Sequence, residues 1–451
     1  MSLDTWQGVE QEFATGAEPI GLFEALGGKG VFLVRPEDNI PRALLRNSGV
    51  CYIHSNLFEV SSPECRNPLE LLAYDKANEA YARLASWAYE EKTGKRVHLY
   101  KTNIASDPKG EAEYTTVGAH ENYLVERAGF ESSMHLLLPY LVLRQVLFGA
   151  GGYVRGEYWV SPRTIFPKTL YSETSTDYPI VSTRDEPHAD ESYFRVHVVN
   201  GEGARSEYTT YLKQSLTAYV LLAIQDGHIR DVPEIADPIR QGQEIARNLD
   251  GDWSVKLADG GRIGVADYLN AHYMEGVERL FADRHPSKQD GRALRELKWC
   301  LEKLGQGLLE DLNTSLEWLI KLALIERGFH QHFQVEEGLD EKNAKEAAVH
   351  QYTAVTDPLF DALVEEHGIR TVISEREVER AFMEPPKNSR GEFRVAAAKR
   401  LEESLSSVSW SNLKLKKGYR RLQYDFPELD GWCPEEIEAR IREAQELLEK
   451  Y

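Results

Sequence analysis

The sequence predicts an α+β fold in which helices are layered against an antiparallel sheet. Short apolar runs bounded by Gly, Pro and Asn, which are typical of strands, fill residues 1–66 and return between 164 and 200. Long helical patterns separate and follow them, at 68–94, 211–226 and 292–327. Strands that come in groups, with helices between the groups, favour α+β layering over a regular βαβ alternation.

The N-terminal part should be mainly extended as far as residue 66, after which a helix begins. Asn67 can cap this helix because Pro68 stands at its first position, where the missing N–H of proline costs nothing. The helical period continues until Gly94. Strands in this part are expected at residues 30–34, 50–53 and 97–100.

The middle of the chain predicts a buried core. Apolar residues are too dense in 132–149 for a surface helix, so this segment should be a buried helical one. Residues 211–226 predict an apolar helix, and the helical pattern of 292–327 is broken near Gly305. Strands are expected at residues 164–169, 179–182 and 194–200. In the last of these, apolar residues occupy every second position.

The end of the chain predicts a small separate domain. Residues 384–394, EPPKNSRGEFR, have the Pro and Gly content of a connector. Residues 434–450 form an amphipathic helical pattern. We therefore expect a large domain over residues 1–384 and a small C-terminal domain over residues 385–451.

Composition and charge exclude several classes of protein. The 451 residues carry 73 acidic and 53 basic side chains, and the net charge of −20 opposes binding to the polyphosphate backbone of nucleic acids. The four cysteines form no CxxC pair and are expected as reduced thiols. The first residues lack the basic start and apolar core of an export signal, and the longest apolar run, 134–154, is interrupted by charged and polar residues. We expect a cytoplasmic protein without nucleic-acid or membrane partners.

The first candidate site is the segment GVEQEF. In a strand, side chains alternate between the two faces, so Glu10 and Glu12 would lie on one face, about 7 Å apart. Carboxylate oxygens suit hard divalent cations, and Mg²⁺ bound to nucleotide phosphates typically takes one or two carboxylates. A solvated strand face is the alternative for an isolated E-x-E.

A second pair of acids lies in FEVSSPE. Glu59 follows two apolar residues and Glu64 follows Pro63, where charges are unusual unless a cation lies opposite. The alternative is a turn with two exposed acids.

The segment GAHENY combines three side chains that could act together. His120, Glu121 and Asn122 can supply ligands for a cation and a hydrogen bond to a phosphate oxygen. Lys101 and Asn103 lie upstream of them. A helix cap with a structural histidine is the competing interpretation.

Two further segments carry arginines that could face an anion. In STRDEPHAD, an extended backbone would place Arg184, Glu186 and His188 on one side, with the guanidinium as a fork for phosphate. In PPKNSRGEFR, Arg390 and Arg394 follow a stiff Pro-Pro turn and could reach a ligand from the domain junction. An ion-paired loop and ordinary linker solvation are the respective alternatives.

These groups do not belong to a glycine-rich phosphate loop, because neither GxxxxGK[ST] nor a strand-linked GxGxxG occurs. Taken in order, they resemble the motifs of the Pup ligase (PafA) and Pup deamidase/depupylase (Dop) family, relatives of glutamine synthetase among the carboxylate–amine ligases. The segments that carry the resemblance are GVEQEF, FEVSSPE, LYKTN, GAHENYL, STRDEPHAD, EYTTYLK and PPKNSRGEFR. The similarity runs from about Trp6 to Arg394.

The resemblance implies a large glutamine synthetase-like domain, in which a curved antiparallel sheet backed by helices holds Mg-ATP, and a small C-terminal domain. It implies ATP and Mg²⁺ as cofactors, a carboxylate donor such as a Pup-like small protein or peptide, and an amine acceptor. By position, the implied metal ligands are Glu10, Glu12, Glu59, Glu64, Glu121 and His188. The implied nucleotide-binding residues are Lys101, Asn103, His120, Asn122, Arg184, Arg390 and Arg394.

One position departs from the family. The family keeps an aspartate in a Y-[VLI]-D segment, where it is the implied base or nucleophile, and here the segment reads Tyr52-Ile53-His54. A neutral imidazole can take a proton from an amine, but it cannot replace an aspartate as the nucleophile of amide cleavage. We therefore predict an ATP-dependent ligase that phosphorylates a carboxylate and passes it to an amine, with His54 and Arg184 as catalytic residues. The alternatives are a catalytically altered nucleotide-binding homologue, either a pseudoenzyme or a phosphotransferase, and a Dop-like amidase or depupylase.

Overall fold

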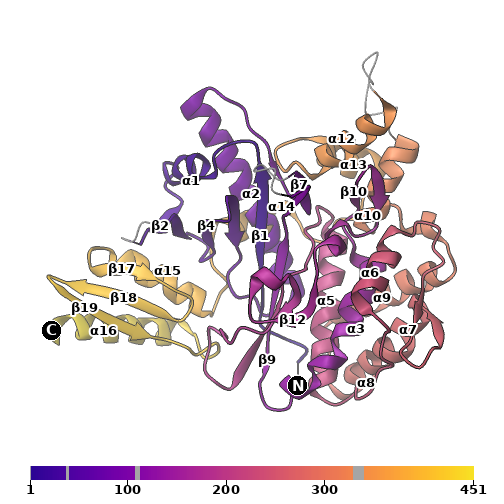
Figure 1. The fold of residues 1–451 in the computed structure, drawn as a ribbon. Coiled ribbons are helices and arrows are strands. Elements are labelled where there is room, and N and C mark those ends of the chain that lie inside the picture. Colours follow the sequence, from indigo (N-terminus) through magenta and orange to yellow (C-terminus); the bar gives the residue numbers. More distant parts are fainter. Residues whose placement is uncertain (1, 37–39, 107–111, 329–339, 451) are drawn as a thin grey trace.

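The computed structural model describes residues 2–36, 40–106, 112–328 and 340–450, and its centre is one large sheet (Figure 1). All neighbouring strands of the sheet are antiparallel except the first two, which run parallel. The predicted α+β fold is therefore confirmed, with one parallel pair added. In spatial order the strands are β12 (Thr169–Ser172), β13 (Pro179–Ser182), β14 (Tyr193–Val198), β9 (Ala119–Glu126), β1 (Gln7–Thr15), β5 (Leu57–Ser61), β4 (Val50–His54), β3 (Arg42–Leu45) and β2 (Phe32–Val34), and β6 (Leu99–Tyr100) also pairs with β1.

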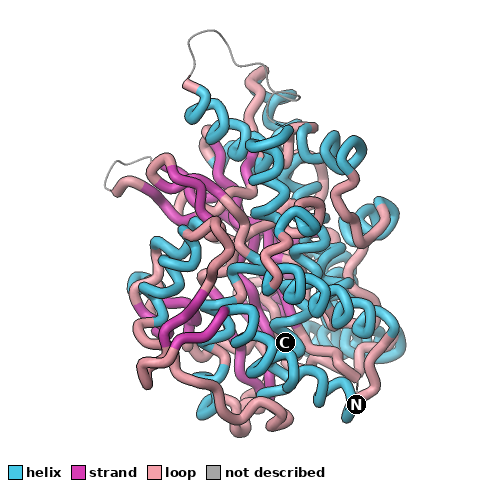
Figure 2. Tube along the Cα trace, turned by 90° about the vertical axis from the view of Figure 1, so that its right-hand side faces the viewer, coloured by secondary structure: helices cyan, strands magenta, loops and turns pink. Residues whose placement is uncertain are grey.

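Helices cover one face of this sheet, and Figure 2 shows most of them on one side of the strands. Phe13 of β1 and Phe58 of β5 are fully buried against α1 (Pro19–Gly27) and α2 (Pro68–Thr93). Farther along the sheet, Val196 of β14 packs in the largest cluster with α3 (Leu138–Leu143) and α5 (Glu207–Gln225). Burying apolar surface in this way is the main favourable term in folding.

The remaining helices and small hairpins surround this core. The helices are α4 (Gln145–Phe148), α6 (Pro238–Arg247), α7 (Val265–Leu269), α8 (Glu275–Asp283), α9 (Lys288–Gly305), α10 (Glu317–Ala323), α12 (Glu341–Thr353), α13 (Leu359–His367) and α14 (Glu375–Met383). The two-stranded hairpins are β7 (Ile104–Ser106) with β8 (Tyr114–Thr116), β10 (Gly152–Val154) with β11 (Glu157–Trp159), and β15 (Ser254–Lys256) with β16 (Arg262–Gly264). Among the described helices, none combines the length and the apolar character that a membrane span requires.

Local capping signals predicted α2 correctly. The Asn67 side chain accepts a hydrogen bond from the Glu70 backbone N–H, and Pro68 is the first helical residue. Gly94 ends the helix in the left-handed region, with φ of 71°, which glycine adopts without steric cost.

Two expectations need correction, and a third needs an addition. Residues 1–66 are mainly extended, as predicted, but Pro19 also starts the short helix α1. The strand expected at 164–169 is instead a 3₁₀ turn, Pro162–Ile165, and β12 begins only at Thr169. The connector expected at 384–394 ends early, because the Ser389 side chain caps helix α15 (Arg390–Arg400).

The C-terminal residues pack around a hydrophobic cluster of their own, drawn in yellow in Figure 1. Phe393 of α15 stacks on Trp432 at a centroid distance of 5.1 Å. Leu44 of β3 also joins this cluster and links it to the large sheet. The cluster is enclosed by α15, by the sheet β17 (Leu405–Val408), β18 (Asn412–Lys417) and β19 (Arg420–Asp425), and by α16 (Pro434–Lys450).

Candidate active site

Strand alternation gives five neighbouring strands a core face and a polar face. On β1, Val9 and Phe13 are buried in hydrophobic clusters, so Glu10 and Glu12 point to the opposite side. The predicted strand and the shared face of these two acids are therefore confirmed. By the same alternation the polar face carries Tyr52 and His54 of β4, Glu59 of β5, His120 and Asn122 of β9, and Arg195 and His197 of β14.

The first cluster on the polar face consists of Glu12, Glu59 and His54. Glu12 and Glu59 are paired across β1 and β5, and their exposed fractions are only 5% and 2%. His54 Nδ1 lies 3.3 Å from Glu59 Oε1, and one ligand atom from each of the three residues lies within 4.8 Å of the others. Burial and the negative charge of Glu12 raise the pKa of Glu59, whereas the adjacent Glu59 carboxylate raises the pKa of His54. Three side chains that could bind a cation therefore converge here.

A tight hairpin places His54 at the rim of this cluster. Ser55 and Asn56, with φ of 48° and 63°, form the two-residue turn between β4 and β5. Positive φ at both central residues is the geometry that matches the twist of a hairpin. The His54 side chain is 68% exposed while its Nδ1 faces Glu59, so the ring can be reached from solvent.

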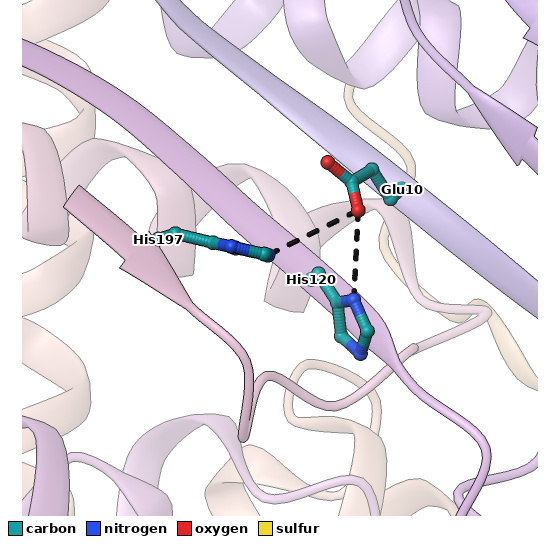
Figure 3. Close-up of side chains that lie close together, drawn as sticks. All are labelled: Glu10, His120 and His197. Atoms are coloured by element: carbon teal, nitrogen blue, oxygen red, sulfur yellow. Dashed lines mark ion pairs between the residues drawn. The ribbon is translucent and has the colours of Figure 1, made fainter. Parts of the chain in front are cut away.

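The second cluster consists of Glu10, His120 and His197 (Figure 3). Glu10 Oε2 lies 3.6 Å from His120 Nδ1 and 3.9 Å from His197 Nε2. His120 Nε2 also lies 3.8 Å from Glu12 Oε1, so this ring connects the two clusters. Asn122 Nδ2 donates to Glu10 Oε1 at 3.2 Å, and Arg195 Nη1 lies 3.7 Å from the same oxygen.

The charges of these groups depend on one another. Burial would raise the pKa of Glu10, but the His120 hydrogen bond and the positive charges around it hold that pKa below its usual range. Burial lowers the pKa of His197 to about 3, so His197 is neutral near pH 7 and free to act as a ligand. Although burial opposes it, the charges of Glu12 and Glu10 raise the pKa of His120.

A pocket continues the polar face beyond Glu10. Its apolar walls include Trp6, Leu124 and Trp410, and the last of these comes from the C-terminal part of the chain. Polar side chains from widely separated segments complete the lining: Glu10, Glu64, Asn122, His188, Arg195 and Arg390. Burial lowers the pKa of His188 to about 4.

Glu64, predicted as a metal ligand, lies outside the two carboxylate clusters and pairs with arginines. Its Oε1 accepts from Arg390 Nε at 2.6 Å, and its Oε2 accepts from Arg394 Nη2 at 2.5 Å. Arg394 also donates to the Ser48 hydroxyl and the Trp410 carbonyl, so its guanidinium is engaged within the protein rather than directed at a phosphate. Both arginines are buried.

Glu121, also predicted as a metal ligand, lies on the core face, away from both clusters. Its carboxylate accepts two bonds from Arg144, at 2.6 and 2.8 Å, and one from the Tyr123 hydroxyl. Being odd-numbered on β9, it points away from its neighbours His120 and Asn122. Its carboxylate is therefore engaged in a fully buried ion pair with Arg144.

Lys101 and Asn103 also have structural partners. Lys101 Nζ donates to Asp75 at 2.6 Å and to Glu79 at 3.2 Å, and its side chain is 1% exposed. Asn103 exchanges two hydrogen bonds with the backbone of Gly203. These contacts support the fold beside the site rather than a nucleotide.

The loop that carries Arg184 is not the extended segment that was expected. His188 has φ of 53°, which breaks the alternation. Arg184 is 53% exposed, and its Nη1 lies 3.7 Å from Glu186. The main chain of this loop is nevertheless tied to the site, because Arg390 Nη1 donates to the His188 carbonyl at 2.6 Å.

Three site residues were missed from the sequence. Arg195 and His197 alternate with the apolar residues of β14, so the same pattern that predicted this strand also places them together on its other face. Arg163 lies in a 3₁₀ turn between β11 and β12, outside the five strands that carry the polar face, and no local pattern marks it.

Comparisons with known proteins identify the family of this chain. Residues 18–414 match the family described as Pup-ligase protein. A Pup–protein ligase of Xylanimonas cellulosilytica is 32% identical over 84% of this chain and 85% of its own length, and one of Actinosynnema mirum is 33% identical with the same coverage. A depupylase of Acidothermus cellulolyticus is 31% identical over 83% of this chain and 75% of its own length.

Solved structures share the fold. The complex of the prokaryotic ubiquitin-like protein Pup with its ligase PafA matches 99% of this chain and 94% of the solved one, with a TM-score of 0.83 at 24% identity. The structure of PafA in complex with ADP matches 91% of each chain, with a TM-score of 0.77 at 23% identity. From the family match and the curated relatives together, this chain belongs to the Pup-ligase family.

Proposed function

We propose that this protein is an ATP-dependent ligase that joins a carboxylate to an amine. The observation that carries the proposal is the pair of buried acids, Glu12 and Glu59, held opposite each other beside His54. Two buried carboxylates close together destabilise a fold unless a bound cation neutralises their charge or they take part in catalysis. The family relationship supports the same reading.

The residues present fit Mg²⁺. Glu59 Oε1 is buried without a hydrogen-bond partner among the described residues, so it is available to a cation. Glu12 and Glu59 would hold one ion, and Glu10 with His120 and His197 could hold a second. Bound magnesium neutralises phosphate charge and orients the phosphates for transfer.

The order of the pocket, Glu10 and Glu12 along β1 indicates how the nucleotide would be oriented. The pocket beyond Glu10 has apolar and aromatic walls, including Trp6 and Trp410, which suit a nucleobase. Glu10 and then Glu12 follow along the strand, so the phosphates would run toward His54. Arg390 lines the pocket, and Arg184 in the exposed loop would approach the phosphates on loading.

The chain's own residues then have separate tasks. Asn122 and Arg195 hold the Glu10 carboxylate in place through the contacts described above. His54 Nε2 could take a proton from the attacking amine, because the ring is solvent-accessible and its Nδ1 is fixed against Glu59. Positioning and charge neutralisation supply most of the catalysis in phosphoryl transfer, which suits a rigid strand platform.

The substrate is a carboxylate carried on a small protein or peptide of the Pup type, and the acceptor is an amine such as a lysine side chain. The relatives named Pup–protein ligase and the solved complex of Pup with its ligase PafA support this choice.

The test is ADP release by the purified protein with Mg-ATP, a Pup-type donor ending in glutamate, and a lysine-containing acceptor. Turnover that needs both substrates and disappears in Glu12→Gln supports the proposal, with Glu126→Gln at the exposed end of β9 as the matched control. Nucleotide binding without turnover for any carboxylate and amine would instead indicate a catalytically altered homologue.

A second candidate is a depupylase, because one relative at 31% identity bears that name. The discriminating assay is cleavage of a lysine-linked donor conjugate with no acceptor present. Cleavage faster than ligation would favour the hydrolase. His54 in place of the aspartate argues for the ligase, since imidazole does not supply the same carboxylate nucleophile.

We also propose that the domain boundary lies at Pro385 and that the protein acts in the cytoplasm. The separate hydrophobic cluster of the C-terminal residues supports the boundary. The free thiols of Cys51, Cys65, Cys300 and Cys433 support a reducing compartment.

A further inference from the structure

A glycine and an arginine meet at the end of the polar face that holds Glu12. Gly118 immediately precedes β9 and stands opposite Glu12: its N–H donates to Glu12 Oε2 at 2.7 Å, and its carbonyl accepts from the Glu12 N–H at 2.9 Å. By strand alternation, a side chain at 118 would point to the same face as His120. The guanidinium of Arg163 fills that place, since an added Cβ would lie only 1.8 Å from Arg163 Nη1.

The Arg163 guanidinium is buried but only partly satisfied. The residue is 4% exposed. Nη2 donates to the Val199 carbonyl at 2.6 Å, whereas Nε and Nη1 have no hydrogen-bond partner among residues 2–36, 40–106, 112–328 and 340–450. Burying a charged group whose donors are unpaired is costly. A partner that arrives with the substrate would complete its bonds.

The position of Arg163 fits a phosphate rather than a carboxylate of the protein. The negative charges of Glu12 and Glu202 act on the guanidinium, and Glu202 accepts from the Arg163 backbone N–H at 2.8 Å. In the described part of the chain, however, the guanidinium itself forms no ion pair with either acid. Arg presents several N–H groups in a planar fork, which matches two oxygens of a phosphoryl group. The free donors lie on the face that carries Glu10, Glu12 and His120.

Arg163 lies at the end of the site where the phosphoryl group would be transferred. Gly118, Glu12 and Glu59 form one row across β9, β1 and β5, and His120 with Glu10 forms the next row toward the nucleobase pocket. A triphosphate that runs from the pocket along β1 would therefore bring its last phosphoryl group to the row of Arg163.

We propose that Arg163 binds the terminal phosphoryl group of ATP, and that residue 118 is glycine because the guanidinium occupies its side-chain position. This inference rests on the proposed function. ADP, which lacks that phosphoryl group, would not make the contact, so Arg163 would distinguish the triphosphate from the diphosphate.

The test compares the affinities of Arg163→Met and the wild type for AMP-PNP and for ADP, by calorimetry with Mg²⁺. Because charge-assisted bonds are lost, the affinity of Arg163→Met for AMP-PNP should fall by about 10- to 100-fold, and its affinity for ADP by less than about 3-fold. Arg155→Met, at an exposed arginine, is the matched control and should change neither affinity. Arg163→Lys keeps the charge without the fork and should show a smaller loss, again confined to AMP-PNP.

Each outcome decides the question. Equal losses for both nucleotides, or no loss, in a folded Arg163→Met protein would overturn the inference. If that variant does not fold, Arg163→Lys decides: an unchanged ratio of the two affinities overturns the inference, and a selective loss of AMP-PNP supports it. A wild-type protein that binds neither nucleotide would instead reject the proposed function itself.

Discussion

Glu12 and Glu59 are paired directly across β1 and β5, and both carboxylates are almost completely buried. A fold gains nothing from placing two acids together, because burial and mutual repulsion both disfavour the ionised pair. The raised pKa of Glu59 is the electrostatic sign of that cost. The pair therefore supports the cation site proposed above.

Replacing Glu59 by Gln should lower the activity without lowering the stability of the fold. The raised pKa means that the folded state disfavours the ionised carboxylate, so at pH 7 the neutral amide should leave the free energy of unfolding unchanged or raise it by up to about 1 kcal/mol. ADP release should fall at least about 100-fold, because a phosphate-neutralising ligand is lost. Urea unfolding without metal and a coupled ADP assay measure the two effects. A strong loss of stability would show that Glu59 supports the fold instead.

Replacing His54 by Ala should impair transfer to the amine and spare nucleotide binding. Removing a general base lowers a rate by about 100-fold or more, whereas the exposed ring fills no part of the core. Ligation kinetics and nucleotide titration measure the two steps, and added imidazole should restore part of the rate. Unchanged ligation by His54→Ala would remove His54 from the mechanism.

Replacing Gly118 by Ala should destabilise the protein through a single methyl group. The new Cβ would collide with the Arg163 guanidinium, and overpacking of this kind costs roughly 1–3 kcal/mol. Gly16→Ala is the matched control, because no atom lies within 4 Å of a Cβ there and its backbone is not left-handed. Thermal unfolding of both variants is the measurement, and equal melting temperatures would contradict the packing described here.

Glu64 should make the stability depend on pH. Although burial opposes it, the charges of Arg390 and Arg394 lower the pKa of Glu64 to about 2, below its value in the unfolded chain. A group with a lowered folded-state pKa stabilises the protein above the unfolded pKa, near 4.5, and loses that contribution as the pH falls toward 2. The contribution at pH 7 is about 3 kcal/mol.

The variant Glu64→Gln tests this directly. Its free energy of unfolding should be lower than that of the wild type at pH 7, and the gap should narrow below pH 4.5. A gap that stays constant down to pH 3 would show that the carboxylate charge does not stabilise the junction with the C-terminal part.

Local signals explain what the sequence could predict. Asn67, Pro68 and Gly94 bound α2 because caps act within one turn. Pro434–Lys450 forms α16, as its amphipathic pattern indicated. The shared face of Glu10 and Glu12 likewise needs only the period of a strand.

What was missed depends on contacts between distant segments. Glu121 follows His120 in the sequence yet faces the core, because its side of β9 meets Arg144 of the helical layer. Glu64 and Arg390 are 326 residues apart, so nothing local shows that they bind each other. Short α1 was missed because its glycines weaken the helical pattern and only Pro19 marks its start.

In the proposed site, the buried carboxylates hold ATP through Mg²⁺. Three calorimetric titrations with ATP test this directly. The first two use the wild-type protein, once with Mg²⁺ and once with EDTA. The third uses the Glu12→Gln/Glu59→Gln double variant with Mg²⁺. We expect binding in the first case and an affinity at least about 10-fold weaker in the other two. The same affinity in all three titrations would contradict this proposal.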